Sequence, residues 1–467
     1  MLTRDNASMI FDSLRRHTSA DEVELLVAGS RSALTRFANN TIHQNMEEES
    51  QHISIRVSFG GRTARATTNK YDEASLRRVV QSAEALARVQ EEDPDLLPMP
   101  SAQQVAQNAA DSGATAVDRY FEQTAAITAQ ERAAAVGHMV EVARHHALTC
   151  AGIFSSAQIV EGIFNSQGVA DWYEQTQAEV SITMIGETSS GWQKVNSPDV
   201  AQLDPARMAE IAAEKTIASQ HPIELTPGKY TVILEPSAVL DAVGFMFWDF
   251  GGSALLEQRS FLNDRVGTQL FGANINVWDD VYHPLQAGVP FDGEGMKRHR
   301  VKLIENGVVQ AVTYARSSAQ RMRQSEIAGK VGPIKATGHG FSLPNEIGEA
   351  PLNIVFAGPS RAETQCVEQM IASTERGILV TRLWYIREVD PYEKLLTGMT
   401  RDGTFLIEDG QIRGGVRNFR FNESLIHMLQ NVESMGEPVR AGGEESMDMV
   451  VPAMKVRDFN FTETTKF

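Results

Sequence analysis

The alternation of hydrophobic and polar positions predicts helices and strands from the start of the chain. Residues 5–18 and 72–89 carry apolar side chains three or four positions apart, the spacing of an amphipathic helix. Strand patterns occupy 22–28, 32–39 and 50–59, and Gly60-Gly61 turns the chain into a further strand at 63–68. We therefore expect an antiparallel meander flanked by two helices.

The same signals continue to a proline-containing link at 221–227. A stretch rich in Ala, Glu and Arg predicts a helix over 115–146, and alternating residues predict strands at 159–164 and 179–185. Asp204 before Pro205 is typical of a helix N-terminus and predicts a helix over 204–220. The link predicts two domains, residues 1–225 and residues 226–467.

The second half is predicted to be richer in strands. A strand at 230–234 is followed by an apolar helix at 238–247, and further helices are expected at 360–374 and 422–432. Tight turns are predicted at Asn306-Gly307, Asp402-Gly403 and Asp409-Gly410. The fold class is therefore α+β in both domains.

Composition and charge exclude several classes of protein. The 467 residues carry a net charge of −17, whereas nucleic acids and anionic membranes are bound by basic surfaces. The sequence contains no run of 18 or more apolar residues and no signal-peptide pattern after Met1. Two cysteines are too few for a disulfide framework and fit a reducing compartment. We expect a cytoplasmic protein that binds neither nucleic acid nor membrane.

Metal ligands are sought first among the 11 histidines. The zinc-protease motif H-E-x-x-H is absent from the sequence. His138, Glu141 and His145 would share one face of the predicted helix and could converge on a metal ion. The alternative interpretation is a solvated polar stripe on that helix.

Two further polar motifs have both a functional and a plain interpretation. Thr337-Gly-His339-Gly could bring a histidine close to a ligand, or it could be a surface turn with a solvated histidine. Asp279-Asp280 with His283 could bind a cation, or it could form a solvated loop. Neither cysteine has a catalytic context, and G-x-S-x-G and P-loop motifs are absent.

Whole segments resemble the TldD/PmbA family, also called TldD/TldE or modulator of DNA gyrase. In the first half the resemblance is carried by Arg36-Phe-Ala-Asn-Asn-Thr-Ile-His-Gln44 and the meander after it. In the second half it is carried by Phe291-Asp-Gly-Glu-Gly295, Leu303-Ile-Glu-Asn-Gly-Val-Val309 and Gly377-Ile-Leu-Val-Thr-Arg382. The order and spacing of these segments, over about residues 20–460, make the resemblance specific.

The resemblance implies a two-domain fold and a heterodimeric metallopeptidase that acts on small or unfolded peptides. In that family a TldD-type subunit holds zinc with an H-E-x-x-x-H helix and a late cysteine, whereas TldE-type subunits lack these ligands. Here Leu240 and Phe245 occupy the two histidine positions and Asp241 the glutamate position, and no cysteine follows Cys366. The chain therefore resembles a TldE-type subunit, with zinc expected in a TldD-like partner and none in this chain.

Such a subunit could contribute walls to a shared peptide cleft, because extended peptides often bind by adding a strand to a sheet edge. Candidate cleft residues are His339, Thr381, Arg382, Tyr385 and Thr397. Two alternatives remain open: an autonomous metallopeptidase using His138, Glu141 and His145, and a non-enzymatic homodimer that binds or regulates.

Overall fold

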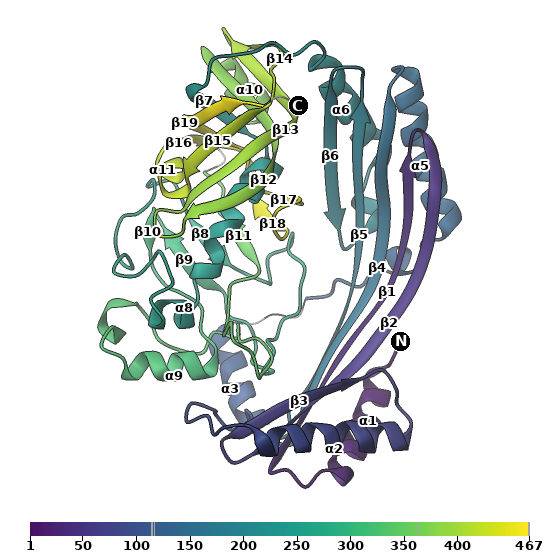
Figure 1. The fold of residues 1–467 in the computed structure, drawn as a ribbon, viewed down its shortest axis with the longest axis vertical. Helices are drawn as coiled ribbons and strands as arrows, with labels where there is room; N and C mark the ends of the chain where they lie inside the picture. The colour runs from purple at the N-terminus through teal and green to yellow at the C-terminus, as the bar shows by residue number, and fades with distance from the viewer. Residues whose placement is uncertain (114, 116, 361, 466–467) are drawn as a thin grey trace.

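The computed structural model describes residues 1–113, 115, 117–360 and 362–465. It contains helices of four turns or more only in the first half of the chain, whereas later helices are short (Figure 1). The α-helices are α1 Arg4–His17, α2 Glu73–Val89, α3 Ala102–Ser112, α4 Glu122–Ala126, α5 Ala129–His145, α6 Pro205–Ala218, α7 Pro236–Val243, α8 Gly252–Leu256, α9 Arg316–Gln324, α10 Val367–Ala372 and α11 Leu425–Gln430. Short 3₁₀ helices are η1 Val200–Gln202, η2 Gly244–Asp249 and η3 Ala328–Lys330. Within the described residues, no helix is long and apolar enough to cross a membrane.

The first half is built on one long, curved, antiparallel sheet (Figure 1). Its strands are β1 Glu22–Ala38, β2 Thr41–Phe59, β3 Arg62–Thr68, β4 Thr149–Asn165, β5 Ala170–Ile185 and β6 Ser190–Ser197. They lie in the order β3-β2-β1-β4-β5-β6. Helices α1 and α2 cover one end of this sheet, and α5 and α6 pack at the other end, so each end has its own apolar core.

The second half contains a small closed barrel. Its strands are β7 Gly228–Leu234, β12 Arg376–Asp390, β13 Leu395–Glu408, β14 Gln411–Gly415, β15 Phe419–Ser424, β16 Val432–Met435 and β19 Met454–Thr464. The order is β12-β7-β19-β15-β13-β14, and an additional pairing of β12 with β13 closes the ring. Strands β7 and β12 are parallel, whereas the other pairs are antiparallel.

A second, mixed sheet packs beside the barrel in the same half. Its strands are β8 Val277–Asp279, β9 Val301–Glu305, β10 Val308–Val309, β11 Ile354–Phe356, β17 Val439–Ala441 and β18 Met449–Val451. They lie in the order β10-β9-β8-β11-β18-β17. One large apolar core joins this sheet, the barrel and helix α7, so the second half is a single packed unit.

The predicted α+β class is confirmed, and the helices with clear N-caps were placed well. Helix α2 begins after Asp72, whose side chain accepts from the N–H of Ser75, and α6 begins after Asp204, which caps Arg207. These caps satisfy N–H groups that have no partner inside the helix. The turns at Asn306-Gly307 and Asp409-Gly410 have positive φ angles, as predicted.

Several predicted boundaries were wrong. The two strands expected at 22–28 and 32–39 are one strand, β1, because the hairpin continues beyond the alternating pattern. The helix expected over 115–146 contains α4 and α5, separated by Ile127 and the N-cap Thr128; its residue 116 lies outside the described residues. Helix α3 was not predicted at all.

Three predictions for the second half also need correction. Asp402-Gly403 is not a hairpin turn but an irregularity inside β13, with φ angles of 51° and 132°. The helix expected over 360–374, of which residue 361 is not described, is only α10. The helix expected over 422–432 is only α11, because its first residues extend β15.

The two halves are joined by apolar and charged contacts. Leu26 and Ile163 of the long sheet pack with Phe291 and Met296 of the second half. Arg65 of β3 donates from Nε to the carbonyl oxygen of Leu343 at 2.7 Å. The long sheet is therefore held against the second half through side chains on β1, β3 and β4.

Candidate functional site

Helix α7 occupies the position that the resemblance assigns to the zinc helix. It starts two residues after β7, with Pro236 in the first turn, where the missing N–H of proline is not needed. The helix packs against β12, β17 and β18, and the residues from Ala238 to Val243 are all buried. The segment is thus part of the core of the second half.

The two positions expected to hold histidines carry apolar side chains. Leu240 is fully buried in the large core, and Phe245 packs against the same core from η2. Neither side chain has an atom that can bind Zn²⁺, which takes thiolate, imidazole or carboxylate ligands. These two positions therefore contribute packing and not coordination.

Asp241 is the one ionisable side chain on α7, and it holds a loop. Its Oδ1 accepts hydrogen bonds from the backbone N–H groups of Glu444 and Glu445, both at 3.0 Å. Its Oδ2 is buried and has no hydrogen-bond partner in the described residues. Burial raises the pKa of Asp241 to about 7, although the two N–H groups and Arg382 act in the opposite direction. The carboxyl group is therefore an anchor for this loop.

The anchored segment, residues 442–446, is here called the clamp loop. Ser237 donates to the carbonyl oxygen of Gly442 at 3.0 Å, and Lys194 of β6 donates to that of Gly443 at 3.0 Å. A Cβ on Gly443 would lie 2.1 Å from Oδ1 of Asp241, so a side chain there cannot coexist with the observed packing. The clamp loop connects α7 with the long sheet of the first half.

Arg382 of β12 forms the centre of a second set of contacts beside the clamp loop. Its guanidinium pairs with Asp402 and lies 4.0 Å from Oε1 of Glu444. The ring of Trp192 from β6 faces the guanidinium at 4.5 Å, and Ser190 donates to Oδ1 of Asp402 at 2.6 Å. Residues of both halves thus hold Arg382, which is only 6% exposed.

Tyr385 lies on the same strand where β12 becomes exposed. Its backbone N–H donates to Oε1 of Glu445 at 2.6 Å, and its φ of 53° interrupts the regular strand. Its ring is half exposed and is covered on one side by Arg387, whose Cζ lies 4.5 Å from the ring centre. Tyr385 is therefore an accessible aromatic side chain at the edge of the clamp loop.

The structure brings together three of the five residues predicted to line a cleft. Arg382 and Tyr385 of β12 contact the clamp loop. Thr381 precedes Arg382 on the same strand, and its buried Oγ1 has no partner among the described residues. Thr397 is half-buried on the neighbouring strand β13, where it pairs with Arg387.

His339 lies apart from this group and is fully enclosed. Its Nε2 contacts Oδ1 of Asp279 at 2.8 Å and its Nδ1 contacts Oγ1 of Thr337 at 3.0 Å. The interpretation of this motif as a solvated surface turn was wrong, and so was that of Asp279 as part of a solvated loop, because both side chains are buried. In this position His339 does not face an open cleft.

The alternative metal ligands on α5 do not form a site. His138, Glu141 and His145 are all exposed on that helix. The described residues contain no group of three His, Cys, Asp or Glu side chains that could hold a metal ion. The solvated stripe is therefore the better description of these residues.

The residues at the family's zinc position do not fit zinc. Leu240 and Phe245 offer no ligand atom, and Oδ1 of Asp241 is already used by two N–H groups. Of the two cysteines, Cys150 is buried and Cys366 lies at the start of α10.

Sequence reasoning missed the clamp loop and its contacts with β6. The Gly442-Gly443 pair followed by Glu444 and Glu445 was the available signal, since paired glycines mark close backbone approach. The pairing of this loop with Asp241, about 200 positions earlier, is a tertiary contact that no local pattern encodes.

Sequence comparisons identify related proteins. The chain matches the model for the PmbA/TldA metallopeptidase C-terminal domain over residues 227–463 and that for PmbA/TldA metallopeptidase domain 1 over residues 23–87. It is 23% identical to metalloprotease PmbA of Escherichia coli O157:H7 over 65% of this chain and 64% of that protein. The identity to the metalloprotease PmbA homolog of Haemophilus influenzae is 22%, over 83% of this chain and 81% of that protein. The chain thus spans less than two thirds of the length of the E. coli protein and more than two thirds of the length of the H. influenzae protein.

Solved structures show the same fold. TldE from Thermococcus kodakarensis superposes with a TM-score of 0.82 at 19% identity, covering 98% of this chain and 99% of that chain. A putative modulator of DNA gyrase from Thermotoga maritima also reaches 0.82, at 17% identity and with the same coverage of both chains. With the domain matches, these likenesses show that the chain belongs to the PmbA/TldD metallopeptidase family.

Proposed function

We propose that this chain is the TldE-like, non-catalytic subunit of a metallopeptidase that processes small or unfolded peptides in the cytoplasm, with a zinc-bearing TldD-like homologue as its partner. The observation that carries the proposal is the lack of metal-ligand side chains on helix α7 and directly after it. The two positions where the resemblance expects histidines carry Leu240 on α7 and Phe245 on η2, and the only carboxylate of α7, Asp241, anchors the clamp loop. A chain with this helix needs a second subunit to supply the metal.

The barrel provides a place for an extended peptide. Strand β7 pairs with β12 only along Gly377–Val380, so beyond that point β12 has β13 on one side and no strand on the other in the described residues. Residues 385, 387, 388 and 389 of this edge are exposed, and of these the N–H of residue 385 is already bonded to Glu445 of the clamp loop. An unpaired strand edge offers main-chain hydrogen bonds to an added strand. We assign the peptide-facing wall to this edge and the clamp loop.

The test is reconstitution with a TldD-like homologue. The two chains should co-purify, and hydrolysis of an unstructured fluorogenic peptide should require both and be abolished by a zinc chelator. Replacing the partner's two motif histidines should abolish activity, whereas Asp241→Asn in this chain should leave it in place. One zinc bound by the isolated chain, together with peptide cleavage by it alone, would contradict the proposal.

A variant of the exposed edge tests the peptide wall separately. Tyr385→Ala should raise the KM of the reconstituted pair about tenfold, since an exposed aromatic anchor contributes roughly 1–2 kcal/mol to binding. Co-purification should be unchanged. Ile412→Ala, on the exposed strand β14, is the matched control and should leave KM as it is. An unaltered KM in Tyr385→Ala would remove β12 from the peptide site.

A further inference from the structure

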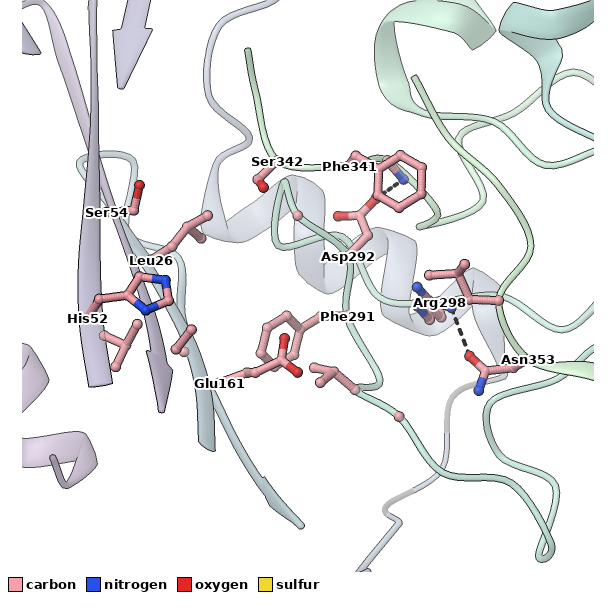
Figure 2. A pocket seen from close by; sticks show the side chains of 18 of the residues that line it. Leu26, His52, Ser54, Glu161, Phe291, Asp292, Arg298, Phe341, Ser342 and Asn353 are labelled. Atoms are coloured by element: carbon pink, nitrogen blue, oxygen red, sulfur yellow. Dashed lines mark hydrogen bonds between the residues drawn. The ribbon is translucent and has the colours of Figure 1, made fainter. Parts of the chain in front are cut away.

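A cavity of about 530 Å³ lies between the long sheet and the loops of the second half (Figure 2). Its size falls in the range of about 300–1,000 Å³ that is usual for small-molecule sites. One wall comes from β1, β2, β3 and β4, and the other from residues within 287–293, from Arg298 and from residues 340–342 and 352–353. It is a separate place from α7 and the clamp loop, which do not line it.

The sheet wall presents an acid and an imidazole on one face. Ala28 of β1 pairs with His52 on one side and with Glu161 on the other, so the three side chains project from the same face of the sheet. The small Ala28 leaves space between the two polar groups, and Figure 2 shows both directed into the cavity. Glu161 forms no ion pair within 4.0 Å among the described residues. The side chains of His52 and Glu161 are both exposed to solvent, so this side of the cavity is open. Partial desolvation by the surrounding protein raises the pKa of the Glu161 carboxyl, and the charge of Arg298 lowers it.

The opposite wall presents a buried guanidinium. Arg298 is 8% exposed, and its Nη1 donates to Oδ1 of Asn353 at 2.8 Å. Its Nε is buried without a hydrogen-bond partner, and no carboxylate of the described residues lies within ion-pair distance of it. Figure 2 shows Arg298 across the cavity from Glu161. The charge of Arg298 acts on Asp279 and Glu161 only from beyond ion-pair distance, so a ligand carboxylate that accepts from the unpaired Nε would stabilise the buried guanidinium further.

The remaining lining side chains are mostly apolar, or are polar groups that already have hydrogen-bond or ion-pair partners within the protein. Leu26, Val289, Phe291 and Phe341 give apolar surface between the two charged walls. The one other carboxylate, Asp292, accepts N–H groups on both oxygens, including that of Gly340 at 2.9 Å. The other arginine, Arg65, is paired with Glu24. Glu161 and Arg298 are therefore the two charges left for a ligand.

We propose that this cavity binds a small zwitterion with an apolar side chain, either a free α-amino acid or a short peptide. Its carboxylate would face Arg298, its ammonium group would face Glu161 and His52, and its side chain would contact the apolar lining. This inference is independent of the proposed peptidase role, because it uses neither α7 nor a partner subunit.

The test is calorimetric titration of the isolated 467-residue chain at neutral pH. L-leucine and L-leucyl-L-leucine are the two probes, and the tighter of them identifies the source of the ligand. N-acetyl-leucyl-leucine and leucyl-leucine amide each lack one terminal charge, and each should bind at least about tenfold more weakly, as expected for loss of a charged hydrogen bond.

Variants of the lining residues test whether the ligand binds in this cavity. Glu161→Gln and Arg298→Gln should each weaken binding about tenfold or more, and Ala28→Phe should abolish it by filling the space. Glu48→Gln, on the exposed part of β2, removes the same charge outside the cavity and should bind as the native chain does. If Arg298→Gln does not fold, Glu161→Gln and Ala28→Phe still decide whether the ligand binds in this cavity. Absence of binding by both probes, or equal binding by all variants, would overturn the proposal.

Discussion

The buried carboxyl of Asp241 should make the protein less stable as pH rises. Burial raises the pKa of Asp241 from 3.8 to about 7, so the folded chain keeps a proton that the unfolded chain loses. Stability therefore falls between those two values, by about 1.4 kcal/mol per pH unit, and is constant outside them. Integrated over the interval, the ionised carboxyl costs about 4 kcal/mol above pH 7.

Asp241→Asn tests this reasoning because the amide keeps an oxygen for the N–H groups of Glu444 and Glu445 but cannot ionise. Relative to the native chain, the variant should gain about 1 kcal/mol of unfolding free energy at about pH 4.5 and about 4 kcal/mol at about pH 8. Urea unfolding of both chains at each pH measures the difference, and titrations elsewhere cancel in the comparison. A difference that stays constant across this range would refute the assignment.

The geometry around the carboxyl can be tested without changing its charge. Gly443→Ala would place a methyl group 2.1 Å from Oδ1 of Asp241, so the clamp loop must move and the chain should lose about 1–3 kcal/mol. Gly137→Ala is the matched control, because nothing lies within 4 Å of a Cβ at that position of α5. It should be neutral or stabilise by up to about 1 kcal/mol. Equal effects of the two substitutions would contradict the packing described for the clamp loop.

Two other predictions concern a buried carboxylate and the two cysteines. Glu24 is fully buried between Arg56, at 2.9 Å, and Arg65, at 2.6 Å. Glu24→Ala would leave both guanidinium groups unpaired and should cost about 3–5 kcal/mol of unfolding free energy, measured by thermal unfolding. A loss below about 1 kcal/mol would contradict this. Burial raises the pKa of the Cys150 thiol to about 11, whereas Cys366 is exposed, so iodoacetamide at about pH 8 should modify one thiol in the native chain and two in urea. Mass spectrometry counts the adducts, and rapid labelling of Cys150 in the native chain would be inconsistent with its burial.

Local chemistry determined the elements whose ends depend on short-range contacts. The cap at Asp204, the start of the helix near residue 72 and the turn at Asp409-Gly410 each depend on side chains or φ angles within three residues, so sequence alone placed them. The length of the hairpin of β1 and β2 was underestimated because its outer part is exposed and lacks an alternating pattern of hydrophobic and polar residues. Cross-strand pairing there stabilises strands that hydrophobic periodicity does not reveal.

The sequence by itself showed that Leu240 and Phe245, at the two positions where the resemblance expects histidines, have no atom that could bind zinc. Only the tertiary structure decided the contacts of Asp241: the clamp loop, about 200 residues later, donates two of its N–H groups to this carboxylate. Likewise, His339 looked like a turn residue between glycines, and only the packing of β8 against it shows a buried partner of Asp279. Contacts between distant segments depend on how whole elements pack, and that information is spread over the entire chain.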